Sequence, residues 1–242
     1  NIACPNIILN TIVADQFKEF ADELEQAEDF DTAVMELIKK TVKEHKRIIF
    51  NGNNYADEWV VEAEKRGLHN FKNMPEAMVH YTDQKNIDLF ARHNIYTEIE
   101  TRARAAIQLE NYGKIRNIEA LTMIDMAKKD ILPAVSSYVK AVADIALSKK
   151  ALSDSIPTEI EINLVTDLSN QLVNFSNKIT ELENTLQEAP QHHNEPLDYA
   201  NFYCHKVFPI MEELRAIGDY METQTASKYW PFPTYAQLLF SV

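Results

Sequence analysis

The stretch LVTDLSNQLVNFSNKITELENTL, residues 164–186, decides the fold. Its large apolar residues recur at intervals of three or four, which places them on one face of a helix and is typical of a seam between packed helices. The seam consists of Leu164, Leu168, Leu172, Phe175, Ile179, Leu182 and Leu186. A helix with such a long apolar face must bury it against partners, so the stretch predicts a helical bundle.

Two further long helices are predicted on either side of this seam. The first extends from Thr97 to about Lys150, and Ser153 to Pro157 then reverse the chain. The second opens at Pro196, since proline is well suited to the first turn of a helix. Three long helices joined by short turns must run antiparallel to bury their stripes. The stripe of the first comprises Ile107, Ile118, Leu121, Ile124, Val135, Val139 and Val142, and that of the last comprises Tyr199, Val207, Met211, Leu214 and Ile217.

Capping and proline signals refine these helices. Thr97 and Thr158 each precede a glutamate by three residues, a capping-box pattern that predicts a helix start at both positions. Pro133 and Pro209 fall inside helical patterns, and each should kink its helix because proline lacks an N–H and crowds the preceding turn.

Shorter helices are predicted before residue 97, over residues 5–28, 31–46, 55–66, 75–80 and 83–93, with Asp31 as the cap of the second. Asn51-Gly52-Asn53-Asn54 is the strongest turn signal in the chain, because Gly and Asn tolerate positive φ. We expect a boundary there.

Composition supports an all-α fold. The chain of 242 residues contains only four glycines, far below the roughly 7% that is usual, and a sheet-rich protein would need more. The predicted architecture is an antiparallel bundle of three long, kinked helices with additional shorter N-terminal helices.

The formal net charge of −13 argues against a nucleic-acid partner, since phosphate binding needs a basic surface. Cys4 and Cys204 show no metal-binding or redox spacing, which fits a reducing, cytoplasmic setting. No uninterrupted apolar run suggests a membrane span and no signal peptide is indicated. Because the chain begins at Asn1, we expect it to be a fragment of a longer protein.

The residues that carry chemistry elsewhere form no convincing site in this sequence. No glutamate is followed by histidine three residues later, as a bundle di-metal site requires, and no glycine-rich phosphate loop or nucleophile elbow occurs. His192 and His193 are interpreted as solvated loop residues, and Cys204 beside His205 as a packed cysteine. The acidic run from Asp22 to Asp31 is interpreted as a solvated helix end. The sequence therefore predicts no catalytic, cofactor-binding or metal residue in this chain.

The C-terminal tail, residues 229–242, carries too many large apolar side chains to remain in water. Two interpretations stay open: the tail caps the core of its own bundle, or it docks on a neighbouring domain or subunit. The apolar side chains are Trp230, Phe232, Tyr235, Leu238, Leu239 and Phe240.

Several separated motifs, in the same order, resemble the C-terminal end of the type III glutamine synthetases. Asn54 stands where that family's Asn-Gly-Asn-Gly-Tyr turn has glycine, and asparagine also tolerates the left-handed conformation. The matching stretches are residues 1–14, 47–59, 109–112, 117–124, 128–134 and 230–242.

The resemblance implies a parent enzyme that joins glutamate and ammonia at the expense of ATP, through a γ-glutamyl phosphate, with magnesium or manganese ions at a site between subunits. It implies that residues 1–50 are the last helical part of the catalytic domain and that residues 51–242 are a C-terminal helical extension. This fragment would hold no cofactor and would be non-catalytic alone. It would serve structural support and oligomer assembly, with its own catalytic domain and neighbouring subunits as partners. The alternative is a free-standing acidic helical bundle that acts as an interaction module.

Overall fold

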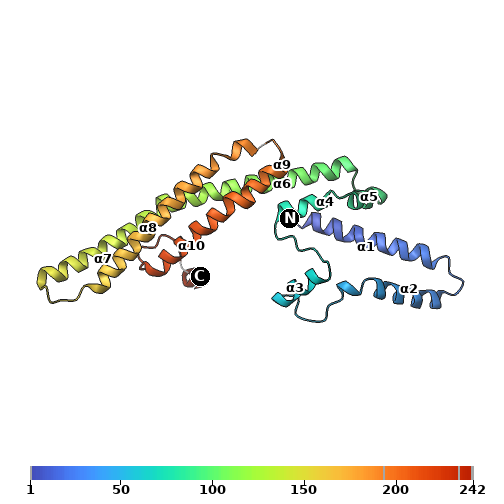
Figure 1. Ribbon diagram of the computed structural model, residues 1–242, viewed down its shortest axis with the longest axis horizontal. Helices are drawn as coiled ribbons and strands as arrows, with labels where there is room; N and C mark the ends of the chain where they lie inside the picture. Colours follow the sequence, from blue (N-terminus) through green and yellow to red (C-terminus); the bar gives the residue numbers. More distant parts are fainter. Residues whose placement is uncertain (1, 193, 234, 241–242) are drawn as a thin grey trace. The chain divides into compact units, whose positions relative to one another are not determined.

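The computed structural model describes residues 2–192, 194–233 and 235–240, and the regular secondary structure within these ranges is helical throughout (Figure 1). The predicted all-α class is confirmed. The chain divides into two compact units, unit 1 of residues 1–106 and unit 2 of residues 107–242. The boundary near residue 50 stays a prediction, because this division does not show which domain of a longer protein residues 1–50 belong to.

Unit 1 consists of short and medium helices around a small core. Tyr81, Phe90 and Ala105 form this core, and Cys4, Ile8, Met78 and Tyr96 pack around it. The start of α6 (Glu98–Met126) also lies in this unit. The preceding helices are α1 (Ala3–Leu24), α2 (Phe30–Glu44), the short 3₁₀ helix η1 (Lys46–Ile48), α3 (Asp57–Lys65), α4 (Met74–Tyr81) and α5 (Gln84–Arg92).

In unit 1 the predicted cap of α2 is wrong, and the predicted turn at residues 51–54 forms without the backbone conformation that was its reason. The cap of α2 is Asp29, which accepts a hydrogen bond from the Thr32 amide at 3.3 Å, because the helix begins two residues earlier than it would with Asp31 as its cap. The turn at residues 51–54 contains no positive φ; in the described chain only Gly67 and Asn94 have one. Gly52 instead leaves room for a neighbouring ring, because a Cβ there would lie 2.5 Å from the Phe50 ring.

Unit 2 contains the long helices. The seam helix, α8 (Glu159–Leu186), packs against α7 (Leu132–Leu152) and against α10 (Phe208–Gln224), and Figure 1 shows it alongside both. Its predicted seam is confirmed, because Leu168, Phe175, Ile179 and Leu182 are almost fully buried. The remaining elements are η2 (Ala127–Ile131), η3 (Ala189–His192), α9 (Pro196–Phe202), η4 (Tyr203–Val207) and α11 (Tyr235–Phe240).

The predicted stripe of α6 is wrong in its N-terminal half. Ile107, Ile118 and Leu121 are more than half exposed, whereas Ala120 is fully buried and Gly113 is buried as well. Beside Leu109 and Ile124, the face that packs carries small residues, which let the neighbouring elements approach closely. Large apolar side chains are therefore left on the outer surface of this helix.

Both interior prolines act through π-helical turns. The turn η2 ends two residues before Pro133, and η4 ends two residues before Pro209. A π turn widens the helix by one residue, which relieves the clash of the proline ring and re-pairs the freed carbonyl groups. The disturbances predicted at these prolines therefore take the form of π turns.

Only one of the two capping boxes forms. The Thr97 amide donates to Glu100 Oε2 at 2.8 Å, and the Glu100 amide donates to Thr97 Oγ1 at 3.3 Å. At the start of α8, Thr158 forms no side-chain cap, because Glu161 instead accepts a 2.5 Å hydrogen bond from Lys149 across the turn. Glu161 therefore pairs with a charged side chain of the preceding helix and does not form the capping box with Thr158.

By length and composition alone, the helical segment Glu98–Leu152 is apolar enough to cross a membrane. Its best 18-residue window has a mean hydropathy of 1.3, and 11% of the window is buried. One such window is weak evidence for a span, because core helices pass the same test. The absence of a membrane span stays a prediction, and the window shows that this segment keeps apolar surface uncovered.

Candidate functional site

A groove with a volume of about 580 Å³ lies within unit 2. One wall is formed by α6 and η2, and the other by the first four turns of α10. Phe175 of α8 is a buried part of the lining, and Trp230 and Phe232 of the tail also line the groove. Most of the lining is apolar, and it is contributed by Ile118, Met123, Met126, Ala127, Ile131, Phe175, Phe208, Met211, Leu214, Trp230 and Phe232.

The two π turns place this lining. Ala127 and Ile131 of η2 line the groove directly, and Phe208 follows η4 immediately. π turns interrupt the regular helical ladder and occur often at functional sites, because they redirect side chains. Here η2 contributes two apolar side chains to the groove, and the residue that follows η4 contributes a third.

The edges of the groove carry charge of both signs. Arg116 pairs with Glu119 at 2.8 Å, and its guanidinium lies 4.6 Å from the centre of the Phe208 ring. Burial lowers the pKa of Arg116, but hydrogen bonds with Tyr112 and Glu119 outweigh burial and raise it above its ordinary value. Arg215 pairs with Asp219 at 3.3 Å. Both arginines are therefore already neutralised.

Two carboxylates at the groove remain available. The side chains of Glu212 and Glu222 are exposed, and within the described residues neither forms a hydrogen bond or an ion pair. With the two arginines neutralised by Glu119 and Asp219, the groove edges have a net charge of −2. The groove combines an apolar lining with an acidic edge.

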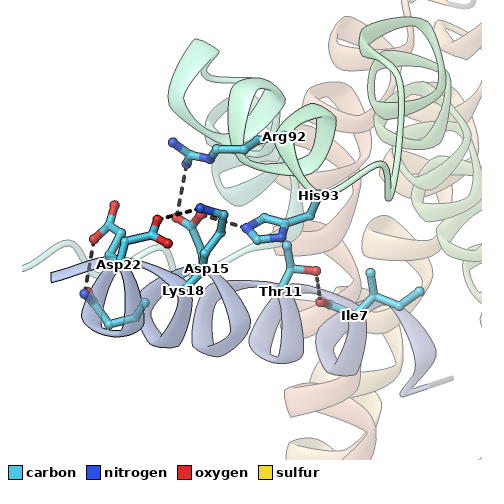
Figure 2. A network of polar contacts seen from close by, with 9 residues as sticks. Ile7, Thr11, Asp15, Lys18, Asp22, Arg92 and His93 are labelled. Atoms are coloured by element: carbon cyan, nitrogen blue, oxygen red, sulfur yellow. Dashed lines mark hydrogen bonds and ion pairs between the residues drawn. The ribbon is translucent and has the colours of Figure 1, made fainter. Parts of the chain in front are cut away.

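A polar network forms a second candidate site, in unit 1 (Figure 2). Asp15 of α1 accepts a hydrogen bond from His93 Nε2 at 2.7 Å and pairs with Arg92 at 3.1 Å. The side chains of Asp15 and His93 are each less than a fifth exposed. Because these contacts join α1 to the end of α5, the network fixes the packing of unit 1.

A third cluster joins residues on both sides of the turn at residues 51–54. Phe50 stacks on Trp59 with ring centres 4.3 Å apart, and the Arg66 guanidinium lies 5.8 Å from each ring. Arg66 also donates to the carbonyl of Ile49 at 2.9 Å. These contacts satisfy Arg66 within unit 1, and they indicate a structural role for the cluster.

The histidines and cysteines weighed from the sequence are not brought together. The prediction of a solvated His192 is wrong in part: the ring stacks on Phe202 at 4.6 Å, and Nδ1 lies 2.7 Å from Asp198 Oδ2. His193 lies outside the described residues. Cys204 is partly buried, whereas His205 is exposed, which confirms the packed-cysteine interpretation. In the described part of the chain no group of three His, Cys, Asp or Glu side chains could hold a metal ion.

The two parts of the tail differ: its start packs on the core of unit 2, and the described side chains of α11 do not. Trp230 packs against the main core of unit 2, and Tyr229 lies 5.4 Å from Tyr138. Leu238 and Leu239 of α11 are largely exposed. The placement of the Tyr235 and Phe240 side chains lies outside the described residues.

Comparisons with known proteins agree with the motifs. Residues 33–150 match the family described as the glutamine synthetase C-terminal domain. A glutamine synthetase of Butyrivibrio fibrisolvens is 38% identical to this chain, and the match covers 86% of this chain and 30% of the relative's length. A type-3 glutamine synthetase of Dictyostelium discoideum is 31% identical over 98% of this chain and 33% of its own length.

A glutamine synthetase of Bacteroides fragilis is 29% identical over the full chain and 34% of its own length. The chain spans about a third of the length of the curated relatives that it matches. The expected resemblance to the C-terminal region of the type III enzymes is confirmed. Through residues 33–150 and these relatives, the chain belongs to the glutamine synthetase C-terminal domain family.

Proposed function

We propose that this chain is the C-terminal helical region of a type III glutamine synthetase, and that it supports the catalytic domain and assembles the oligomer. The parent enzyme would make glutamine from glutamate, ammonia and ATP, as a ligase of nitrogen metabolism in the cytoplasm. The observation that carries the proposal is the amount of large apolar surface that both units leave exposed. Exposed apolar surface of this extent is typical of a part that packs on other domains or subunits.

The helix α1 supplies the strongest support. Its first twelve residues, 3–14, contain no charged side chain, and a helix segment with so few polar residues is typical of the inside of a larger structure. Leu9, Val13 and Phe17 lie four residues apart, on one exposed stripe, and Phe17 is 67% exposed. This stripe fits residues 1–50 as the last helical part of the catalytic domain, covered by the rest of that domain.

The helix α2 repeats the pattern. Met35, Ile38 and Val42 follow helical spacing, and each is at least half exposed. Burying one such side chain contributes about 1.5–3 kcal/mol, so the two exposed stripes together offer substantial binding free energy to a neighbouring part of the enzyme.

The proposed C-terminal extension, residues 51–242, contains the whole of unit 2, and unit 2 would be its scaffold. In this proposal, α6 to α7, α8 and α9 to α10 are the three long, kinked helices of an antiparallel bundle. Ile107, Leu121 and Ile145 remain on its outer surface. These side chains would contact neighbouring subunits of a homo-oligomer.

The catalytic chemistry would lie outside these residues. Magnesium or manganese and ATP would bind to the parent enzyme, and this region would contribute no catalytic, cofactor-binding or metal residue. Its partners would be its own catalytic domain and neighbouring subunits, with no nucleic acid and no membrane involved.

Deletion of residues 51–242 from the longer enzyme tests the proposal. We expect loss of the native oligomer, measured by analytical ultracentrifugation, together with loss of glutamine synthesis. A deletion variant that assembles and turns over normally would contradict the supporting role. A start codon directly upstream of Asn1, with no preceding frame for a metal- and ATP-binding domain, would favour the free-standing module instead.

A further inference from the structure

We propose that the groove in unit 2 binds a short, basic, amphipathic helix of a partner protein. This inference goes beyond support and assembly, and it does not depend on them. It is carried by three properties of the groove: its length, its adaptable apolar lining and its unpaired carboxylates.

The groove is elongated. Its lining residues extend from Arg116 to Ile131 along one wall and from Phe208 to Glu222 along the other. At 1.5 Å per residue each wall is about 20 Å long, which corresponds to nearly four turns of an α-helix. A volume of about 580 Å³ distributed over that length holds a row of side chains but no whole helix. The shape therefore suits the apolar stripe of a helix that lies along the groove.

The lining can adapt to such a stripe. Met123, Met126 and Met211 line the groove together with aromatic rings. Methionine side chains are unbranched and polarizable, so they fit apolar anchors of different shape. Gly218 adds no side chain to the wall and thereby keeps this part of the groove open.

The unpaired carboxylates select the charge of the partner. Glu212 and Glu222 are ten residues apart on α10, or about 15 Å along its axis. Both are exposed and without a partner in the described chain, while the groove arginines are already paired. Lysine or arginine residues near both ends of a bound helix would meet these two glutamates. The net charge of −13 adds long-range attraction for a basic segment.

Binding of synthetic peptides to the 242-residue chain tests the proposal. The probe is a fluorescent peptide of about 15 residues, long enough to span the groove, with leucines at i, i+3, i+4, i+7 and i+11 and lysines at the other turns. One comparison peptide carries glutamate in place of lysine, and another has the basic composition in scrambled order. Fluorescence anisotropy measures each Kd. We expect the ordered basic peptide to bind at least about tenfold more tightly than either comparison peptide.

Two variants of the chain locate the binding. The double variant Glu212→Gln/Glu222→Gln should weaken the basic peptide about five- to tenfold, since each exposed pair contributes modestly. Its matched control, Asp154→Asn/Glu188→Gln, removes two exposed carboxylates outside the groove and should leave Kd within about twofold. Thr122→Phe places a ring in the groove from the exposed wall of α6 and should abolish binding. Circular dichroism of each variant verifies folding.

Four outcomes would overturn the proposal: no binding of the ordered basic peptide, equal binding of basic and acidic peptides, an equal effect of the control variant, or undiminished binding to Thr122→Phe. A fifth is self-association of the chain that Thr122→Phe abolishes, because a second copy would then occupy the groove. The peptide-binding test and the deletion experiment on the longer enzyme are independent, so failure of one does not decide the other.

Discussion

At the scale of single residues, Tyr81 is an example of a polar group that is buried but not hydrogen-bonded within the described residues. Its hydroxyl is buried, and no group in the described part of the chain lies in position to form a hydrogen bond with it. Burial, with the nearby Cys4 and Tyr96, raises the pKa of Tyr81 to about 12. The phenol thus remains neutral and contributes packing against Phe90, with ring centres 5.9 Å apart.

We therefore expect Tyr81→Phe to leave stability unchanged or to raise it by up to about 1 kcal/mol, because it removes an unpaired buried hydroxyl. The control is Tyr203→Phe, which removes a hydroxyl that donates to Asn117 at 3.0 Å. That variant should lose about 0.5–1.5 kcal/mol. Urea unfolding measures both, and a clear loss in Tyr81→Phe would show that its hydroxyl has a partner.

Asp15 is the residue on which the polar network of unit 1 depends. Asp15→Asn removes the charge that His93 and Arg92 share (Figure 2), and we expect a loss of about 1–3 kcal/mol in unfolding free energy. Asp22→Asn on the same helix is the control. It removes an exposed pair with Lys18 and should cost less than about 1 kcal/mol. Equal losses in the two variants would contradict the role of the network.

Glu161 introduces a pH dependence. The hydrogen bond from Lys149 lowers the pKa of the Glu161 carboxyl below its ordinary value of 4.5. A lowered folded-state pKa stabilises the fold above the unfolded-state pKa, and that stabilisation is lost as pH falls through the folded-state pKa. Glu161→Gln should thus be less stable than the parent chain at pH 7.

The difference between Glu161→Gln and the parent chain should shrink steadily below pH 4.5. Urea unfolding at several pH values between 7 and 3 follows it. Asp144→Asn, which removes an exposed pair with Lys140, serves as the control and should show a smaller difference. A difference for Glu161→Gln that does not change with pH would assign its effect to packing instead.

At the scale of elements, two buried helical glycines make opposite predictions. A Cβ at Gly113 would lie 2.3 Å from the Tyr199 ring, whereas a Cβ at Gly218 would lie 3.5 Å from Phe175. Gly113→Ala must displace a buried ring, and we expect a loss of about 1–3 kcal/mol. Gly218→Ala meets ordinary contact and gains helix propensity, so it should stabilise by about 0.5–1 kcal/mol. Thermal unfolding compares them, and the same sign for both would contradict the packing described for α6.

The same elements show what the sequence could predict. The seam of α8 was predictable because leucines at regular spacing are buried on both sides by α7 and α10. The inner face of α6 was not, because Gly113 and Ala120 carry little apolar signal while Ile118 and Leu121 carry much. When a helix packs closely, small residues face inward, and hydrophobicity alone then selects the wrong face.

The groove was beyond sequence reasoning for a related reason. Its walls come from segments about ninety residues apart, and spacing within one helix does not reveal which walls will meet. The local signals were Pro133 and Pro209, which predicted disturbed helices but not that η2 and η4 would flank one groove. The Asp15–His93 pair is likewise joined only by the fold.

At the scale of the whole molecule, the apolar stripes of α1 and α2 are exposed in the isolated chain, and in the proposed longer enzyme another part would cover them. Phe17 and Ile38 contribute little to the stability of this chain, since both are at least half exposed. They become important only where another part of the enzyme covers them. A single pair of substitutions can therefore separate folding from assembly.

We expect Phe17→Gln/Ile38→Gln to change the unfolding free energy of the isolated chain by less than about 1 kcal/mol. In the longer enzyme the same variant should reduce the oligomeric fraction and the rate of glutamine synthesis, because two polar groups would replace buried apolar contacts. The control Glu19→Gln/Lys39→Gln changes exposed charged residues on the same two helices and should leave assembly intact. Mass photometry of the longer enzyme and urea unfolding of the isolated chain measure the two effects. Normal assembly of Phe17→Gln/Ile38→Gln would show that these stripes remain in water, and some other surface would then have to join this region to the enzyme.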